Sequence, residues 1–316
     1  MRGATKAMKV GASTERKQAS ALARIEWPTV ALACSIYTSF LLLTWYHAAL
    51  PWWLLLPLGT ITVVLHGSLQ HEVIHGHPTR WRRLNDGLGK PALWLWMPYE
   101  LYRGLHLRHH RNDILTDPLD DPESYYVTGS RWQDLPIPMR AVLIANQTVA
   151  GRLSLGPVLA VFGFWREELR RLRAGDRRHL AIWLEHAGWM ALVLAWSLGV
   201  CGMPFWQYVL FLALPGTSLS MLRSYMEHRP AVEPGERCAI VEAGAVLGFL
   251  FLHNNLHAVH HRWPAVPWYR LPALYRARRE DVLAWNGDYR IEGYRQILRR
   301  FLVRPKDHPI HPDYIV

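Results

Sequence analysis

The chain has 316 residues, of which 50% are hydrophobic, and a formal net charge of +11. Its apolar residues fall in long runs separated by Arg-rich stretches, which is typical of an integral membrane protein and argues against two soluble domains. The basic residues flank these runs and no nucleic-acid-binding motif is present, so we expect no nucleic-acid partner. The widely separated Cys34, Cys201 and Cys238 favour neither a disulfide framework nor a thiolate metal site.

Two pairs of apolar runs predict four transmembrane helices. Pro28–Leu50 and Trp52–Leu69 are each near the roughly 20 residues that cross a bilayer, and the turn between them carries no Lys or Arg. Residues 1–27 contain six Lys and Arg residues, so the positive-inside rule places this N-terminal tail in the cytoplasm. Leu180–Val200 and Pro204–Leu219 predict a second hairpin of the same orientation.

The segments on the cytoplasmic side are polar and basic. Within residues 71–178, the short apolar stretches Pro91–Leu101 and Leu155–Trp165 predict interfacial helices. After the fourth run the chain returns to the cytoplasm, where Arg279–Arg300 has a helical pattern. Glu185 and His186 lie inside the third run, and such an intramembrane pair is either functional or a packing contact between helices.

These elements predict an all-α integral membrane protein with two transmembrane hairpins and a helical cytoplasmic cap that carries the histidine clusters. We divide the chain into the N-terminal tail, a membrane domain over residues 28–301 and a C-terminal tail over residues 302–316. By charge and topology we expect a bacterial inner-membrane protein whose two termini and functional site face the cytoplasm.

Four histidine clusters emerge on that same side and form a candidate metal site. Two clusters have the form HxxHH and one the form HxxxH, so within a helix their imidazoles share a face. Imidazole suits iron, zinc, copper and nickel, and nine ligands exceed what one ion uses but fit two ions with positions left for oxygen or water. The candidate ligands are His71, His75, His106, His109, His110, His228, His257, His260 and His261.

Two alternatives belong to different classes of protein. His71–His75 also matches HExxH, the zinc metalloprotease helix in which Glu72 is the general base. That hypothesis uses three metal ligands and leaves most of the histidine clusters unexplained. The other alternative is a membrane protein that binds metal without catalysis.

The order HxxxH, HxxHH, HxxHH, placed between and after paired transmembrane helices, resembles the membrane-bound fatty acid desaturase family. This family belongs to a histidine-box superfamily with alkane hydroxylases and with carotenoid hydroxylases and ketolases. The resemblance covers about His66–Tyr289, and Leu115–Pro118 and His261–Pro264 also look like bacterial members. It implies that the nine histidines bind two iron ions, with O2 as the co-substrate.

The resemblance also leaves part of the ligand set open. Animal acyl desaturases carry an Asn four residues before the extra histidine, where this chain has Ser224 before His228. Alkane hydroxylases have Asn-Tyr-x-Glu-His there, of which this chain keeps Tyr225 and the Glu-His pair. We therefore treat His253 as a possible ligand or supporting residue, and we expect supporting carboxylates among Glu72, Asp113, Asp117, Asp120, Asp121 and Glu227.

The resemblance implies oxidation of an unactivated C–H bond, which requires a cofactor. Our main hypothesis is introduction of a double bond into a fatty acyl chain, either in a lipid or bound to a carrier, and the alternative is hydroxylation of an alkyl chain or carotenoid. The chain has no haem or flavin motif and no cysteine set for an iron–sulfur cluster. We expect electrons from a separate ferredoxin or rubredoxin, steered by the basic face.

Overall fold

The computed structural model describes residues 25–315, so most of the predicted N-terminal tail lies outside the described residues. The described chain is predominantly helical, as predicted, and four helices are long and apolar enough to cross a membrane. Two of them include π-helical segments. The four are α2 (Trp27–Trp45), α3 (Trp52–Ile74), α10 (Arg177–Leu194) continued by η2 (Ala195–Val200), and the helix formed by α11 (Phe205–Tyr208), η3 (Val209–Ala213) and α12 (Leu214–Ser224).

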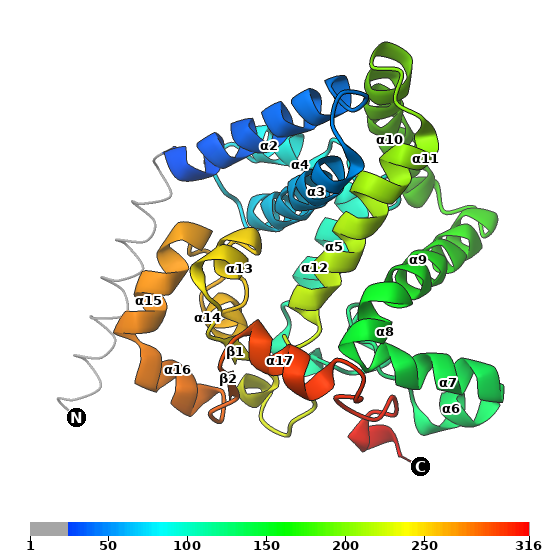
Figure 1. The fold of residues 1–316 in the computed structure, drawn as a ribbon. Coiled ribbons are helices and arrows are strands. Elements are labelled where there is room, and N and C mark those ends of the chain that lie inside the picture. Colours follow the sequence, from blue (N-terminus) through cyan, green and yellow to red (C-terminus); the bar gives the residue numbers. More distant parts are fainter. Residues whose placement is uncertain (1–24, 316) are drawn as a thin grey trace.

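Helix α3 is the centre of this helix layer, because it packs against α2 on one side and against η3 and α12 on the other (Figure 1). Two glycines permit the close approach. A Cβ atom on Gly216 would lie 2.4 Å from Val63 Cγ1, and one on Gly59 would lie 2.6 Å from the carbonyl oxygen of Phe211. Small residues at such crossings let transmembrane helices pack closely. Helix α10 packs instead against α5 and α9.

This crossing gives a direct test of the helix packing. We expect Gly216→Ala to destabilise the fold by about 1–3 kcal/mol, because the added methyl overpacks the α3–α12 contact. The matched control is Gly188→Ala in α10, where an added Cβ meets no atom within 4 Å. Thermal unfolding of the detergent-solubilised protein measures both variants, and an equal effect of the two would contradict the close packing.

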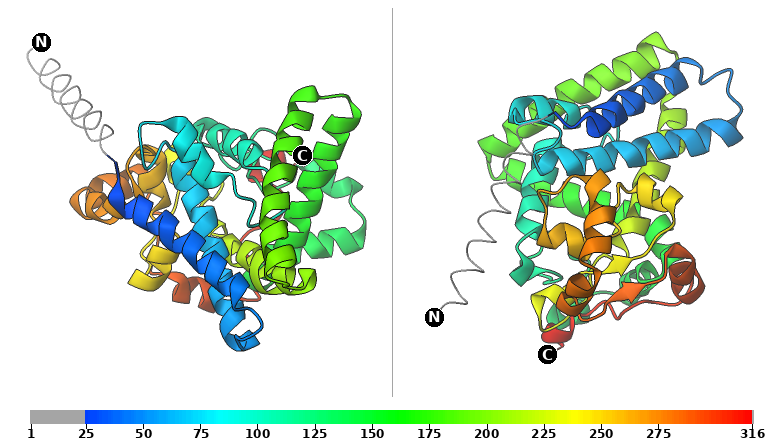
Figure 2. Two further views of the ribbon diagram at one scale, coloured as in Figure 1. Left: turned by 90° about the horizontal axis from the view of Figure 1, so that it is seen from above. Right: turned by 90° about the vertical axis from the view of Figure 1, so that its left-hand side faces the viewer.

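The remaining elements form the cap that the sequence predicted, together with two short strands that it did not. Strands β1 (Ile240–Val241) and β2 (Arg290–Ile291) pair in parallel. Figure 2 shows the C-terminal helices gathered on one side of α2 and α3. The other elements are α4 (Arg82–Gly89), α5 (Tyr99–His109), η1 (Asn112–Ile114), α6 (Gly129–Asp134), α7 (Ile137–Asn146), α8 (Val149–Ser154), α9 (Gly156–Arg173), η4 (Pro234–Arg237), α13 (Ala245–Leu250), α14 (His257–Arg262), η5 (Trp268–Arg270), α15 (Leu271–Ala277), α16 (Arg279–Trp285), α17 (Tyr294–Phe301) and η6 (Pro312–Tyr314).

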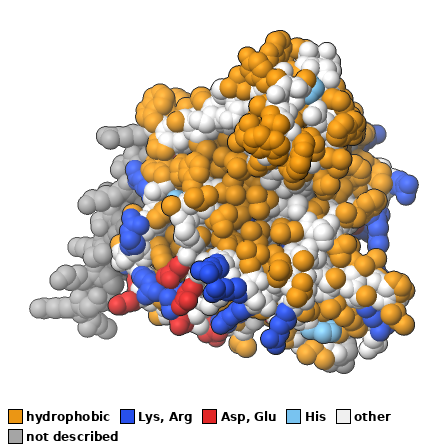
Figure 3. Space-filling model, viewed as in Figure 1, with side chains coloured by type: hydrophobic (Ala, Val, Ile, Leu, Met, Phe, Trp, Pro, Cys, Tyr) orange, Lys and Arg blue, Asp and Glu red, His pale blue; other side chains and the backbone are white. Residues whose placement is uncertain are grey.

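The surface is divided in the way a membrane protein requires. In Figure 3, hydrophobic side chains cover the upper and central part of the face, and most charged side chains gather below them. Large apolar residues of the transmembrane helices are exposed, among them Trp52, Leu192 and Phe205. Such exposure is costly in water and favourable against lipid.

The predicted interfacial helix at Pro91–Leu101 was wrong over most of its length. Residues 91–98 form turns, and helix α5 begins only at Tyr99. Pro98 accounts for the start of α5, since a proline disfavours helical backbone in the residue before it and suits the position where a helix begins. Leu95, with a φ of 69°, also departs from helical geometry. The second predicted stretch, Leu155–Trp165, is helical from Gly156 onward and forms the first part of α9.

The predicted helix over Arg279–Arg300 is also divided. Helices α16 and α17 are separated by a turn in which Gly287 and Asp288 have φ values of 60° and 51°, and by strand β2. Left-handed backbone at two successive residues cannot continue an α-helix.

The intramembrane pair Glu185 and His186 holds α10 in place. Glu185 forms an ion pair with Lys90, and His186 Nε2 lies 2.9 Å from the carbonyl oxygen of Leu95. Both contacts join α10 to residues 90–98. The packing alternative therefore accounts for this pair.

Candidate metal centre

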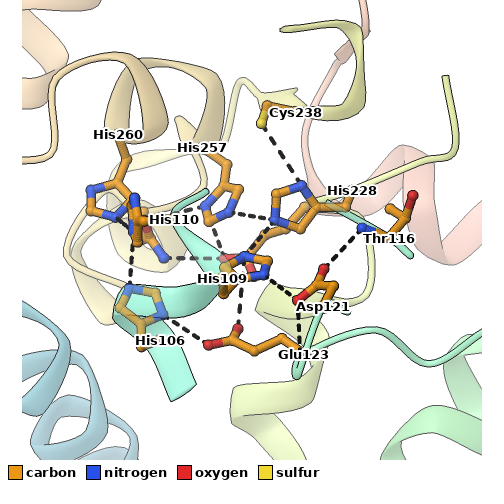
Figure 4. Close-up of polar contacts among 12 residues, drawn as sticks. His106, His109, His110, Thr116, Asp121, Glu123, His228, Cys238, His257 and His260 are labelled. Atoms are coloured by element: carbon orange, nitrogen blue, oxygen red, sulfur yellow. Dashed lines mark hydrogen bonds and ion pairs between the residues drawn. The ribbon is translucent and has the colours of Figure 1, made fainter. Parts of the chain in front are cut away.

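All nine predicted ligand histidines lie together between the ends of α3, α5 and α12 and helix α14. Figure 4 shows six of them: His106, His109, His110, His228, His257 and His260. The last turn of α3, the last turn of α5 and the first turns of α14 each present one cluster, and His228 follows the end of α12. Within each of two groups, one nitrogen from every ring lies within 4.8 Å of all the others. One group is His71, His75, His106, His110 and His260, and the other is His109, His228, His257 and His261.

The outward-facing ring nitrogens donate to protein acceptors. His106 Nδ1–H donates to Glu123 Oε1 and His109 Nδ1–H donates to Asp121 Oδ1, each at 2.8 Å. His228 Nδ1–H donates to the carbonyl oxygen of Arg237 at 3.2 Å. Such acceptors fix the tautomer, so that Nδ1 carries the proton and Nε2 keeps its lone pair.

The other nitrogens then face one another with lone pairs. His109 Nε2 and His228 Nε2 are 2.9 Å apart, and His228 Nε2 and His257 Nε2 are 3.0 Å apart. In the five-histidine group, His110 Nε2 lies 3.0 Å from His106 Nε2. Two neutral rings in this tautomer cannot hydrogen-bond to one another, and a cation at the centre of each group, either a proton or a metal ion, removes that conflict.

Burial keeps most of these rings neutral. It holds the pKa values of His228, His257 and His260 well below the usual range, and the neighbouring imidazoles lower them further. The neutral ring is the form that binds metal. In addition, the Nε2 atom of His71 is buried and makes no hydrogen bond within the described residues.

The carboxylates beside the rings have the opposite effect, because they raise the pKa of a histidine. Burial alone would lower the pKa of His109, but Glu123 and Asp121 raise it to about 9. Burial also raises the pKa of Glu227 to about 7, although the nearby Arg223 opposes this shift. The site therefore combines a set of neutral nitrogen donors with an acidic rim that favours positive charge, and this donor set fits two transition-metal ions.

Asp121 and Glu227 contact the candidate ligands, as two of the predicted supporting carboxylates. Glu227 Oε1 and Asn254 Oδ1 both lie 3.3 Å from His257 Nδ1. Glu123, which the sequence did not single out, contacts both His106 and His109. Its position two residues after Asp121 in the acidic run is the signal that would have found it.

The other predicted carboxylates lie elsewhere. Asp113 pairs with the exposed Arg111, and Asp120 pairs with Arg108. Asp117 accepts backbone N–H groups of the following turn and the hydroxyl of Tyr314. Across residues 25–315, none of these three forms a hydrogen bond or ion pair with a candidate ligand. They serve the loop and not the histidines.

Glu72 also has a structural contact. Its Oε2 accepts the backbone N–H of Trp268 at 3.1 Å. The zinc protease hypothesis requires this carboxylate as the general base at the metal. Because Glu72 is committed to Trp268 and the histidines form two groups, the geometry argues against a protease.

His253 lies outside both groups. In a single helix over His253–His261, His253 would share the face of His257, but α14 begins at His257, and Leu252 and His253 have φ values of 46° and 57°. This left-handed turn removes His253 from the face that carries His257, and its ring stacks on Trp268 with centroids 6.2 Å apart. Ser224, the other uncertain position, lines a small cavity beside His228.

The C-terminal segment supports the site from outside. Lys306 Nζ donates to the carbonyl oxygen of His228 at 3.0 Å, and Tyr126 O–H donates to Asp307 at 2.6 Å. His311 Nε2 lies 3.0 Å from Thr116 Oγ1. These contacts fix the loop that carries Asp121 and Glu123.

The fold and the site thus define a helical membrane protein with two adjoining histidine groups suited to two metal ions. The fatty acid desaturase family model matches residues 43–293. The chain belongs to this family, and with it to the membrane di-iron histidine-box superfamily of desaturases and oxygenases.

Curated relatives add the chemistry of individual members. The chain is 26% identical over 225 residues to a beta-carotene ketolase of Haematococcus lacustris, covering 65% of this chain and 56% of that protein. It is 27% identical over 227 residues to a zeaxanthin 4-ketolase of Chlamydomonas reinhardtii, covering 68% and 42%. A beta-carotene ketolase of Paracoccus sp. (strain N81106 / MBIC 01143) is 24% identical over 246 residues, covering 74% and 77%. The chain spans about half the length of the algal relatives it matches.

Proposed function

We propose that this protein is a membrane di-iron oxygenase that oxidises a ring carbon of a carotenoid, as a ketolase does. The observation that carries the proposal is the two-group histidine site in a chain whose reported relatives are named as carotenoid ketolases. Our main hypothesis from the sequence, desaturation of a fatty acyl chain, has less support than the carotenoid alternative, although the family as a whole carries the desaturase name.

The residues of the chain have separable tasks in this proposal. Iron bound at the two groups would supply the redox chemistry that activates O2 for oxidation of a ring C–H bond. The histidine Nε2 atoms would hold the ions, while Asp121 and Glu123 hold the protons on Nδ1 of His109 and His106 and so fix the ring orientations. The apolar helices on the membrane side of the site would admit a lipid-soluble substrate and exclude water.

The electron donor remains part of the proposal. We propose that a reduced ferredoxin or rubredoxin docks at the basic, cytoplasmic end of the molecule, where opposite charge would steer it. Turnover with each purified donor, followed at low and high salt, tests this. Turnover by another donor, with none from these two, would contradict it.

Expression in a host that accumulates β-carotene tests the function. We expect carotenoid products in which two hydrogens of a ring carbon have been replaced by one oxygen, detected by liquid chromatography and mass spectrometry. The fatty acids of the same cells are analysed in parallel. Loss of two hydrogens from a fatty acyl chain, with the carotenoids unchanged, would support the desaturase hypothesis and overturn this one.

A further inference from the structure

We propose that the cavity beside His228 holds water and that Tyr126 and Asp307 connect it to the surface, so that together they form the route by which protons reach the metal centre. This inference rests on the proposed function, because it concerns the protons that the proposed reaction consumes. It starts from the cavity itself, which has a volume of about 30 Å³. A buried water molecule requires roughly 10–15 Å³, so the cavity has room for about two.

The lining of the cavity suits water. Every side chain that lines it carries a group able to form hydrogen bonds, and none of these residues is exposed. Among them are the hydroxyl-bearing Ser124, Tyr126 and Ser224 and the carboxylate-bearing Glu123 and Glu227. Buried water is held where it finds several such partners, and a chain of water molecules can carry a proton.

The inner end of the cavity lies against the four-histidine group. His228 belongs to that group and also lines the cavity. Of the other lining residues, Asp121 contacts His109 and Glu227 contacts His257. Figure 4 shows Asp121 and His228 together with His109. These carboxylates keep their hydrogen bonds to the rings, and it is the water between them that carries the proton.

The outer end of the cavity is connected to the surface through Tyr126. Its side chain is 5% exposed, and its hydroxyl donates to Asp307 Oδ2 at 2.6 Å and can still accept a hydrogen bond from water. Lys306 Nζ lies 2.7 Å from the same Oδ2, so Oδ1 is left for solvent, and the Asp307 side chain is 32% exposed. His311 contacts the lining residue Thr116 but is only 4% exposed. Asp307 is therefore the surface end of the route.

The balance of the proposed reaction requires such a route. When O2 oxidises a ring C–H bond to C–O–H, the O–O bond breaks, one oxygen atom enters the substrate and the other leaves as water. This takes two electrons from the donor protein and two protons from solvent. Two such oxidations of one carbon, followed by loss of water, give the ketone. Most of the histidine rings are buried, and the apolar helices on the membrane side carry no protons, so the protons enter through the cap.

Turnover in H2O and in D2O tests the route. Full-length iron-loaded protein in detergent oxidises β-carotene with the donor protein that supports the wild type. We expect Tyr126→Phe and Asp307→Ala each to lower kcat about tenfold with KM unchanged, and to increase the solvent isotope effect, because proton delivery becomes the slowest step. Formate, a small acid, should restore turnover in Asp307→Ala and not in Tyr126→Phe.

The matched control is Tyr314→Phe. The hydroxyl of Tyr314 donates to Asp117 at 2.7 Å and holds the same loop to the C-terminal segment, but Tyr314 does not line the cavity. We expect this variant to keep the kcat and the isotope effect of the wild type. If these tyrosines only fixed the loop, both variants would have the same effect. Iron content and thermal unfolding of each variant separate a slower proton transfer from loss of the site.

A second pair of variants tests the cavity. Ser224→Val replaces a lining hydroxyl with a larger apolar group, and we expect it to lower kcat about as much as Tyr126→Phe does. Ser220→Val makes the same change on the same helix, at a residue that does not line the cavity, and should leave kcat within about twofold of the wild type. A high-resolution structure of the iron-loaded wild type should show ordered water in the cavity within hydrogen-bonding distance of the Tyr126 hydroxyl.

The outcomes separate two failures. If Tyr126→Phe turns over with the rate and isotope effect of the wild type, if Tyr314→Phe has the same effect as Tyr126→Phe, or if the cavity contains no water, the proton route is overturned while the proposed function stands. If the iron-loaded wild type forms no oxidised carotenoid with any donor protein, the proposed function fails, and the proton route fails with it.

Discussion

Replacement of His257 with Ala is expected to abolish activity and to reduce bound iron from about two ions per chain to about one. His257 is one of four nitrogen donors in its group, and its Nε2 lies 3.0 Å from that of His228. Three remaining rings in a site built for four bind the ion weakly, whereas the five-histidine group keeps all its ligands. We expect turnover below about 1% of the wild-type rate, because the reaction requires both ions. Metal analysis of the purified protein measures the iron directly.

The control for this variant is His253→Ala, four residues earlier in the sequence. Its ring stacks on Trp268 and lies outside both groups, so the iron content should stay near two ions per chain. If this variant loses iron as His257→Ala does, the assignment of the ligands from the geometry is incorrect. If His257→Ala keeps both ions, the two-group site itself is contradicted.

The positions of His257 and His253 also show how much of the site the sequence could predict. The spacing of the histidines placed the rings of each cluster on one helix face, and loop charge placed the clusters on one side of the membrane. Those two signals are local and were sufficient to select the nine residues that the structure brings together. They left the role of His253 open, because the left-handed backbone at Leu252 and His253 interrupts the helix, and no proline or glycine at these positions indicates it.

The non-helical segment at residues 91–98 was missed for a different reason. Its apolar residues and two tryptophans satisfied the pattern of an interfacial helix, although prolines stand at both ends. The conformation depends on donors that are distant in the sequence, such as His186 and Tyr208, which satisfy its carbonyl groups. Long-range hydrogen bonds of this kind leave no periodic signal.

The supporting carboxylates show the same limit within a single loop. Asp113, Asp117, Asp120 and Asp121 are close in sequence to the HxxHH cluster of α5, and composition does not distinguish them. The turn decides. Asp121 is buried and faces His109, whereas Asp113 is exposed and faces Arg111.

This difference gives the second large expected effect. Asp121→Asn should lower metal affinity about 10- to 100-fold, because the neutral amide no longer favours the proton on Nδ1 of His109 or raises the basicity of the ring. Iron retention under a chelator series measures the affinity without reference to turnover. The lost ion should be that of the four-histidine group, to which His109 belongs.

Asp113→Asn makes the same chemical change in the same loop and serves as the matched control. We expect it to retain iron as the wild type does, because its carboxylate pairs with Arg111 at the surface and such exposed pairs contribute little. Equal iron loss in both variants would mean that the net charge of the loop, and not the hydrogen bond to His109, holds the ion. Retention in both would mean that the ring orientation is fixed without Asp121. The expected difference between two aspartates eight residues apart therefore depends on the direct contact between Asp121 and His109.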